Sequence, residues 1–459
     1  MSFTESLDDL VLSSEDRLLG THPSWERVRL FEIGNVLNGF AFSSKAFSKT
    51  EGADLIRIRD IVEGTTETKY SGDFDPLYLV NTGDLLVGMD GDFNRAIWRG
   101  GPALLNQRVC KIETDERFYR RRFLFHVLPG YLQAINRATS SVTVKHLSSR
   151  TLQDLPIPLP STQEQDRIVD EIDKQFSRLD AAMEALKRVQ ANLKRYRTSV
   201  LKAACEGRLV LAKEPGLYPR AKVLGLLREP LANGRSPQTS NAGYRILRLT
   251  AIKNSLVNTQ EWRFGILEDK QVANLSIKPE DILISRGNGS KSLVGLAGLV
   301  GIAETSSEPV MFPDTMIRVR LNKELCDPQF FVLLWNSRFV RDQIESAART
   351  TAGIHKISQA DIERFEIPLP TIEDQLRIVA AAARVLTIAD HTNSSLGRLI
   401  ALSARLRTSV LADAFSGKLV PQDPTDEPAS VLLERIHAEP NASTAKTVAR
   451  RRLQELVHV

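Results

Sequence analysis

The sequence predicts an α+β protein with two pseudo-repeated globular domains, separated by two long antiparallel helices of the coiled-coil type. Residues 157–210 recur as residues 367–420 at a constant offset of 210, and both copies have the periodicity of one long helix. Ahead of each copy, short β-rich runs alternate with Gly, Asn and Asp turns and a few helices, such as 118–132 and 328–346. The chain therefore has an internal two-fold organisation.

The two long segments share their motifs in the same order, with no insertion between them. Each begins with an IPLP run, in which proline favours extended backbone ahead of the helix. Because order and spacing are kept throughout, the repeat indicates duplication rather than ordinary helical composition. The paired motifs are IPLP from Ile157 and Ile367, Gln165 and Gln375, RIV from Arg167 and Arg377, RTSVL from Arg197 and Arg407, and Gly207 and Gly417.

Each long segment carries the signals of a single helix. In the first copy, Ser161 and Glu164 form a capping-box pattern, and Gly207 is a typical stop. About 40 residues at the helical rise would span about 60 Å. We expect the two helices to pair with each other; alternatively, each packs only on its own domain. The expected apolar stripes are Ile168, Ile172, Phe176, Leu179, Met183, Leu186, Val189, Leu193, Tyr196 and Val200, and Ile378, Ala382, Leu386, Ala389, Leu396, Leu399, Leu402, Leu406 and Val410.

The repeat divides the chain into five predicted parts. Within the globular domains, Asn38-Gly39 corresponds to Asn233-Gly234, and the GDLL run from Gly83 corresponds to EDIL from Glu280. Trp25 has no clear counterpart in the second half. The expected parts are a first globular domain (1–156), a first long helix (157–210), a second globular domain (211–366), a second long helix (367–420) and a polar, basic tail with a short helix (421–459).

Composition narrows the class of protein. Among 459 residues, 61 Lys and Arg against 56 Asp and Glu give a net charge of +5, which suits nucleic acid without requiring it. Three distant cysteines are typical of reduced thiols in an intracellular protein. The polar start MSFTESLDDL is no signal peptide, and no run approaches 18 apolar residues. We therefore expect a soluble, cytoplasmic protein.

The chain lacks the motifs of the enzymes that act on nucleic acids. It has neither the Gly-rich cofactor turn nor the Asn/Asp-Pro-Pro-aromatic loop of a base methyltransferase. GNGSKS from Gly287 departs from a phosphate-binding loop, because serine stands where glycine must precede the lysine. No His/Cys group has metal-ligand spacing, and no nuclease core stands out. These absences favour a binding or scaffolding protein over an enzyme.

The duplicated cassette resembles the specificity subunits of type I restriction-modification systems. It follows the order IPLP, Gln, RIV, long helix, RTSVL and GxLV, and it stands twice behind variable domains. The resemblance extends from about Trp25 to the DEPASVLLERI segment at 426–436, and three loops add to it: GMDGDFN from Gly88, GGPALLNQR from Gly100 and DILISRGNGS from Asp281.

The resemblance implies a non-catalytic, DNA-binding subunit that acts in defence against foreign DNA. Two target-recognition domains would each read one half of a split, asymmetric site in double-stranded DNA, and the helices would set the spacer. Two modification subunits would dock here and methylate adenine at N6, using S-adenosylmethionine. A restriction subunit using ATP and Mg would add cleavage. This chain itself would bind no cofactor.

Base reading requires polar side chains on loops held by a rigid frame, with Arg suited to guanine and Asn or Gln to adenine. In the second domain the Gly-rich loop after DILIS offers Arg286, Asn288, Ser290 and Lys291. We expect these residues to contact DNA; alternatively, the loop is a solvated hairpin tip.

In the first domain the corresponding loop offers Asp90, Phe93 and Asn94. Its acids would disfavour phosphate contact, but they could accept from cytosine amines or hold the loop. The nearby Gln107 and Arg108 are donors for DNA, with a structural role as the alternative.

Two basic pairs recur ahead of the IPLP runs, Lys145-His146 and His355-Lys356. We expect them to contact phosphates and fix register, with a solvated helix end as the alternative. The RTSVL arginines are expected to serve the helix pair or a partner subunit.

Two other functions stay open from the sequence. The chain could be a stand-alone DNA-binding regulator with two reading heads, which would bind its site tightly alone. It could also be a degenerate scaffold that only assembles partner subunits. Extensive exposed apolar surface on the paired helices would favour a subunit that docks partners.

Overall fold

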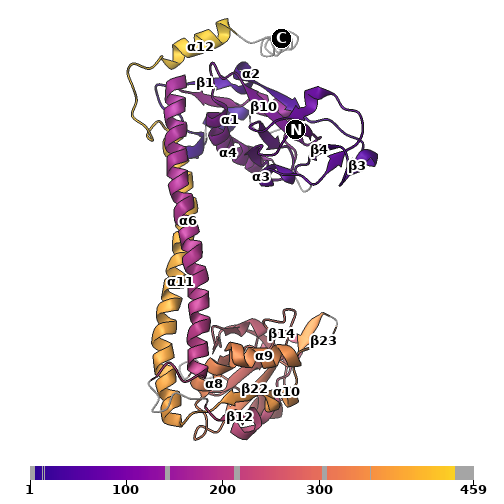
Figure 1. Ribbon diagram of the computed structural model, residues 1–459, viewed down its shortest axis with the longest axis vertical. Coiled ribbons are helices and arrows are strands. Elements are labelled where there is room, and N and C mark those ends of the chain that lie inside the picture. The colour runs from indigo at the N-terminus through magenta and orange to yellow at the C-terminus, as the bar shows by residue number, and fades with distance from the viewer. Residues whose placement is uncertain are drawn as a thin grey trace. The chain divides into compact units, whose positions relative to one another are not determined.

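The computed structural model describes residues 6–439 except 13, 15, 140–144, 211–217, 302–307 and 352 (Figure 1). The chain divides into two compact units: unit 1 comprises Met1–Glu184 and Leu399–Val459, and unit 2 comprises Ala185–Arg398. Each long helix contributes one part to each unit. The basic run from Ala449 lies outside the described residues.

Unit 1 has mixed α and β structure. Its sheets have the strand orders β3-β5-β4-β9-β6, β2-β10-β7-β8 and β1-β11. Its elements, apart from the long helices, are α1 (Leu7–Leu12), η1 (Arg17–Leu19), β1 (Glu26–Arg29), α2 (Leu30–Ile33), β2 (Gly34–Asn38), η2 (Ser44–Ala46), β3 (Phe47–Ser48), β4 (Ala53–Ile56), α3 (Asp60–Glu63), β5 (Lys69–Tyr70), η3 (Pro76–Tyr78), β6 (Leu79–Val80), β7 (Leu85–Gly88), β8 (Arg95–Ile97), β9 (Ala103–Leu105), β10 (Val109–Thr114), α4 (Arg121–Ala138), α5 (Ser149–Gln153), β11 (Pro156–Leu159) and α12 (Ala429–Ala438).

Unit 2 is built in the same way, with strand orders β13-β22-β18-β20-β16-β15, β17-β14-β21, β19-β24-β23 and β12-β25. The helix predicted at 328–346 is broken at Asn336-Ser337 into two. The elements are β12 (Arg220–Lys222), η4 (Val223–Leu226), β13 (Leu227–Asn233), β14 (Thr239–Leu247), η5 (Leu249–Ala251), β15 (Ile252–Lys253), β16 (Leu256–Val257), β17 (Trp262–Gly265), α7 (Asp269–Leu275), β18 (Ile282–Ser285), β19 (Gly287–Asn288), β20 (Ala297–Leu299), β21 (Val310–Met311), β22 (Met316–Leu321), α8 (Pro328–Trp335), α9 (Arg338–Ala347), β23 (Arg349–Thr351), β24 (Ile354–Lys356), α10 (Gln359–Arg364) and β25 (Glu366–Pro368).

The repeat appears as two helices of equal length, α6 (Thr162–Cys205) and α11 (Ile372–Phe415), each of 44 residues. The Ser161 hydroxyl accepts from the Glu164 N–H at 3.0 Å, which satisfies a free amide in the first turn. Gly207 and Gly417 follow the helix ends with φ of 67° and 66°, the left-handed conformation that glycine adopts without strain. The glycine stop and the Ser161 cap are therefore confirmed, whereas the Glu164 side chain accepts from Trp25 and Gln422 instead of completing the predicted capping box.

The two helices run side by side in opposite directions within each unit (Figure 1). In unit 1, Arg407 of α11 pairs with Asp180 of α6 and lies 4.7 Å from the Phe176 ring. In unit 2, Arg197 of α6 pairs with Asp390 of α11. The RTSVL arginines thus join the helix pair, as expected.

The predicted apolar stripes are only partly buried. Ile168 and Ile172 are fully buried in unit 1, where α6 packs against its globular part. Val189 and Tyr196, which the periodicity assigns to the seam, are instead 42% and 53% exposed. Leu399, Leu402 and Leu406 of the second stripe are also exposed. The helical period alone does not distinguish a seam residue from an apolar residue beside the seam.

Two buried glutamines fasten the long helices to their units. Gln165 is 0% exposed, and its amide accepts from the Arg120 N–H at 2.7 Å, where α4 begins. Gln375, also 0% exposed, accepts from the Asp327 N–H at 2.8 Å, where α8 begins. Each side chain also donates to two carbonyls, so the whole amide is satisfied.

Each unit has the same central strand frame. Ile112 of β10 faces Leu85 of β7, as Val319 of β22 faces Ile282 of β18. This register confirms the predicted GDLL and EDIL correspondence.

The predicted glycine correspondence is also confirmed. A Cβ at Gly39 would lie 2.0 Å from a carbonyl oxygen, and one at Gly234 would lie 2.1 Å from another. Close backbone approach therefore requires glycine after both β2 and β13.

Tyr218 is the counterpart of Trp25 that the sequence did not reveal. Val28 faces Ile157 across β1 and β11, and Ala221 faces Ile367 across β12 and β25, so the register places Tyr218 where Trp25 stands in unit 1. The Trp25 indole donates to Glu164 at 2.9 Å. Burial, followed by the charge of Asp374, raises the pKa of Tyr218.

The core of unit 1 is closed by both ends of the chain. Leu18 and Leu19 pack in it from the N-terminal side, and Phe415, Leu432 and Ile436 from the C-terminal side. The short helix predicted for the tail is α12, which carries the last two of these residues. No helix among the described residues combines the length and apolarity of a membrane span.

Candidate nucleic-acid interface

In unit 1, two candidate loops that are distant in sequence meet beyond the end of β7. The Leu147 N–H donates to the Met89 carbonyl at 2.6 Å, and Asp90 forms an antiparallel bridge with His146. Leu147 is fully buried, which anchors this junction. The segments 89–94 and 145–146 therefore form one surface.

Asp90 organises the polar residues on this surface. One carboxylate oxygen lies 2.7 Å from the Arg108 guanidinium, and the other lies 2.7 Å from His146 Nδ1. The Asp90 side chain is 12% exposed, whereas those of Arg108 and His146 are 62% and 57% exposed. Both oxygens are engaged, so Asp90 holds the loops, the second of its two predicted roles, while its partners face outward.

The other predicted residues of this surface differ in accessibility. Asn94 and Gln107 are exposed. Phe93 is 1% exposed and belongs to the core of unit 1, and its backbone has a positive φ of 52°. Phe93 is therefore wrong as a predicted DNA contact, because packing occupies its ring.

Lys145 is tied to α4 rather than free at the surface. Its ammonium lies 3.0 Å from the Asn136 side-chain oxygen and also donates to the Asn136 carbonyl, near the C-terminal end of α4. Cations are favoured there, because the last carbonyls of a helix are unpaired. Asn136 in turn donates to Gly91 at 2.6 Å. Lys145 and Asn136 therefore position the loop, and no local motif had indicated Asn136.

The same junction recurs in unit 2. The Ile357 N–H donates to the Arg286 carbonyl at 3.0 Å, and Gly287 of β19 pairs with Lys356 of β24. Ile357 is 2% exposed and anchors the junction as Leu147 does in unit 1. The Gly-rich loop and the second basic pair, predicted separately, thus lie side by side.

A buried arginine of α9 hydrogen-bonds to the backbone of the Gly-rich loop. Arg341 of α9, with a side chain 9% exposed, donates to the carbonyls of Lys291 and Ser292, both at 3.2 Å. Burial lowers the pKa of Arg341, partly offset by Glu345. Sequence reasoning missed Arg341, whose only signal is its place in the amphipathic helix α9.

The outward groups of this loop are available to a ligand. Ser290 and Lys291 are exposed, and Asn288 is half-buried and caps the turn by accepting from the Ser290 N–H at 3.1 Å. The Arg286 side chain makes no hydrogen bond or ion pair with any described residue. Lys356 is exposed.

His355 is held in place beside the loop. It is half-buried, and its Nδ1 lies 3.0 Å from the Thr350 hydroxyl across β23 and β24.

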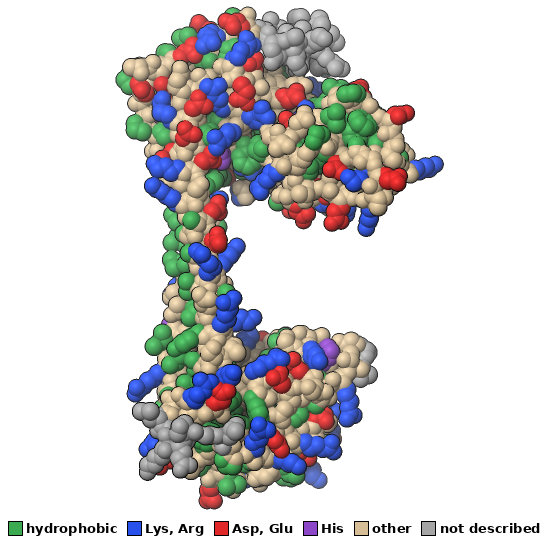
Figure 2. All heavy atoms as spheres, in the orientation of Figure 1, with side chains coloured by type: hydrophobic (Ala, Val, Ile, Leu, Met, Phe, Trp, Pro, Cys, Tyr) green, Lys and Arg blue, Asp and Glu red, His purple; other side chains and the backbone are tan. Residues whose placement is uncertain are grey.

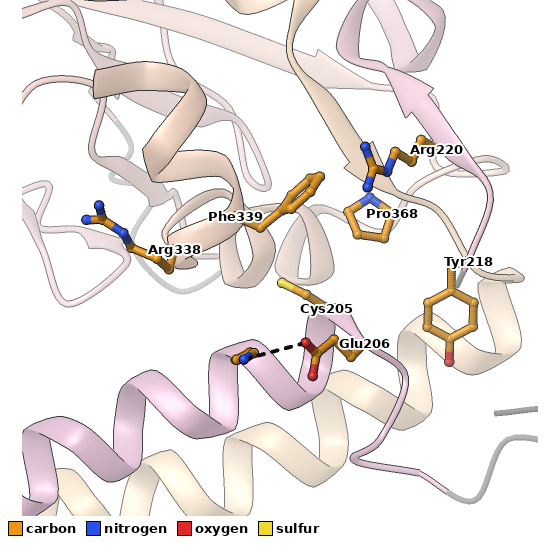
Figure 3. Close-up of a pocket in the computed structure, with 8 residues that line it drawn as sticks. Cys205, Glu206, Tyr218, Arg220, Arg338, Phe339 and Pro368 are labelled. Carbon is orange, nitrogen blue, oxygen red and sulfur yellow. Dashed lines mark ion pairs between the residues drawn. The ribbon is translucent and has the colours of Figure 1, made fainter. Parts of the chain in front are cut away.

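Unit 2 contains a cavity of about 410 Å³ (Figure 3). Its apolar lining includes Cys205, Phe339 and Pro368. In unit 1, the position that corresponds to Cys205 carries Phe415, which is 1% exposed and packs in the core. The cavity of unit 2 thus lies beside a position where unit 2 has a smaller side chain than unit 1.

Charge is interspersed over the visible surface of both units (Figure 2). No uniformly positive face is visible in this view. Within the described part of the chain, no group of three or more His, Cys, Asp or Glu residues could hold a metal ion.

Comparison with known proteins gives the family. The model of the "type I restriction modification DNA specificity domain" matches residues 23–194 and again residues 232–393. The chain is 34% identical to the type I restriction enzyme EcoBI specificity subunit of Escherichia coli, over 98% of this chain and 100% of that protein. It is 26% identical to the EcoKI specificity subunit of Escherichia coli strain K12, over 75% of this chain and 77% of that one.

Solved structures agree on the fold. One chain, from work on complex assembly and conformational transition of the type I R-M system, has a TM-score of 0.67 at 17% identity and covers 87% of this chain and 99% of its own. The HsdS subunit from Thermoanaerobacter tengcongensis has a TM-score of 0.51 at 17% identity, covering 87% and 98%. With two matches to one family model and a full-length relative at 34% identity, this chain belongs to the type I restriction-modification specificity subunits.

Proposed function

We propose that this chain reads a bipartite, asymmetric site in double-stranded DNA, one half with each globular domain, within the predicted limits 1–156 and 211–366. The helices, at 157–210 and 367–420, set the spacer and dock two modification subunits. Those subunits bind S-adenosylmethionine and methylate adenine at N6. A restriction subunit using ATP and Mg adds cleavage in the cytoplasm.

The observation that carries this proposal is a shared frame with different side chains on it. The junction of Leu147 with Met89 repeats as that of Ile357 with Arg286, so two surfaces of one geometry are presented. The exposed groups differ between them, with Arg108 and His146 in unit 1 and Lys291 and Lys356 in unit 2. Equal frames with unequal side chains suit two half-sites of different sequence.

The helices support the docking of two copies of one partner. Val189 and Leu399 are 42% and 47% exposed, and Tyr196 and Leu406 are 53% and 43% exposed. Each pair is related by the 210-residue repeat. Large apolar side chains exposed at repeated positions form two similar patches, as two identical partners would require.

A methylome tests the proposal. Cells that express this chain with its modification subunit should carry methyladenine at one split motif, with a fixed spacer and one mark on each strand. Cells lacking the chain should carry none. A soluble complex without chain-dependent methylation would indicate the degenerate scaffold, whereas tight sequence-specific binding by the chain alone would indicate the stand-alone regulator.

A further inference from the structure

The strand register allows the reading surfaces of the two units to be compared residue by residue. In unit 1, Val109 of β10 faces Gly88 of β7. The next position along is Arg108 against Met89, whose N–H donates to the Arg108 carbonyl at 2.8 Å. Met89 is 6% exposed, so Arg108 is the outward member of this backbone pair.

Unit 2 has the same backbone pair with its side chains exchanged. Met316 of β22 faces Ser285 of β18, and the next position is Thr315 against Arg286. The Arg286 N–H donates to the Thr315 carbonyl at 2.7 Å, as Met89 does to Arg108. In unit 2 the arginine, Arg286, therefore stands at the position of Met89, and Thr315 stands at the position of Arg108.

The backbone of Arg108 indicates a specialised position. Its φ is 71°, a left-handed conformation that is costly for a residue with a side chain. Such strain persists where surrounding contacts enforce it, often at binding sites. Here the Asp90 carboxylate, 2.7 Å away, holds the guanidinium while the side chain stays 62% exposed.

We propose that Arg108 and Arg286 are the guanine-reading side chains of the two half-sites, presented from opposite members of one backbone pair. The inference rests on the proposed DNA-reading function and adds to it the base that each unit reads. A guanidinium donates two parallel hydrogen bonds to O6 and N7 of guanine in the major groove. It is long enough to reach a base edge from either member of the pair.

A phosphate contact explains Arg108 less well. Asp90 accepts from Arg108 with one oxygen and lies 2.7 Å from His146 with the other, so a phosphate at Arg108 would approach a carboxylate. A guanine edge is uncharged and meets no such repulsion. Asp90 is therefore a positioning residue that fixes the direction of the Arg108 fork.

The test uses the assembled complex of the full chain with its modification subunits, so that each half-site controls for the other. Methylation is measured on duplexes in which every base pair of the wild-type motif is replaced in turn. Arg108→Ala should reduce discrimination at one G·C pair by roughly 5- to 150-fold and leave the other half-site unchanged. Arg286→Ala should do the same in the opposite half-site.

Matched controls separate base reading from general binding. Arg150→Ala and Arg364→Ala remove exposed arginines from α5 and α10, and these variants should keep the base preference even if overall affinity falls. Asp90→Asn should weaken discrimination at the same base pair as Arg108→Ala and leave the other positions of that half-site unchanged, whereas a loss spread over the whole half-site would contradict its role in positioning Arg108. Arg108→Lys keeps the charge but loses the fork, and it replaces the alanine variant if that complex does not assemble.

Several results would overturn the inference. A wild-type motif with no G·C pair in one half-site would do so at once. Retained base preference in both arginine variants, or relaxation of the same half-site by both, would also contradict it. Loss of chain-dependent methylation in the wild type would instead remove the proposed function, so the two failures are distinguishable.

Discussion

Arg407 pairs with Asp180 in unit 1, and the repeat offset of 210 carries this ion pair onto Arg197 and Asp390 in unit 2. Both copies of the repeat thus contain the same ion pair between the two long helices. The side chains of Asp180 and Asp390 are 69% and 50% exposed, so water screens both pairs.

We expect each of these ion pairs to contribute less than about 1 kcal/mol to the free energy of unfolding. A double-mutant cycle with Arg407→Met and Asp180→Asn, followed by denaturant unfolding, measures the coupling directly. The cycle on Arg197 and Asp390 is the matched control and should give a similar value. A coupling of several kcal/mol in either pair would contradict this expectation.

The buried glutamines should matter far more than exposed ones. Gln165→Leu leaves the Arg120 N–H and two carbonyls without their partner, at about 1–3 kcal/mol for each buried group left unpaired. Gln375→Leu should have a comparable effect in unit 2. Thermal unfolding should show a clear loss of stability for both, whereas Gln163→Leu, at an exposed neighbouring position, should leave stability unchanged. An equal loss in the control would contradict the role of the amide.

Acid should destabilise unit 1 through His126. This side chain is 4% exposed, and burial, aided by the charges of Arg95 and Arg122, lowers its pKa to about 3. An unfolded histidine titrates near pH 6.5, so the unfolded chain binds the extra proton between these values. The free energy of unfolding should therefore fall as pH decreases below about 6.5.

Unfolding of wild type and His126→Phe at pH 7.5 and 5.5 checks this. The variant should lose most of the pH dependence in this range, because the carboxylates titrate mainly at lower pH. An unchanged pH dependence in the variant would assign the effect to other groups.

Filling the cavity of unit 2 should stabilise the protein. Cys205→Phe introduces the residue that unit 1 carries at the corresponding position, Phe415, into a space of about 410 Å³. We expect a gain of about 0.5–2 kcal/mol, seen as a higher melting temperature. Cys205→Ser is the matched control and should give no gain. A lower melting temperature for the phenylalanine variant would mean that the cavity cannot accept the ring.

Each exposed helix patch should hold one partner subunit. Tyr196→Asp places a charge in one patch, and Leu406→Asp does so in the other. Under the proposed function, each variant should bind one modification subunit instead of two, and the double variant should bind none, as native mass spectrometry would show. Two bound copies in both single variants would place the docking surface elsewhere.

The sequence predicted long helices within 157–210 and 367–420, and each observed helix begins and ends five residues inside those limits. This agreement is good because the motifs of the helices are local and repeated. The prediction failed where the outcome depends on tertiary contacts. Phe93 lies in a loop of Gly and Asp, and only the fold turns it into the core. Tyr218 was not identified as the counterpart of Trp25, because the sequence offset between these two residues differs from the offset of 210 that relates the helices.

For the candidate interface, the sequence named the segments but not their roles. It assigned Lys145 to phosphate contact and left Asp90 with two roles, base reading or holding the loop. In the structure both side chains hold neighbouring groups in place. Such roles depend on which loops meet, and that is set by strand register between distant segments. The roles of Arg341 and Asn136 could not be predicted for the same reason.

The closure of the unit 1 core by both chain ends has a consequence for synthesis on the ribosome. Its core needs Ile172 early and Ile436 late, whereas the main core of unit 2 runs only from Ala204 to Ile378. At ordinary translation rates the nascent chain waits roughly 10–50 s between those two isoleucines. The second unit can therefore complete its fold before the first, and synthesis that stops between residues 378 and 429 yields a chain whose earlier unit is the unfinished one.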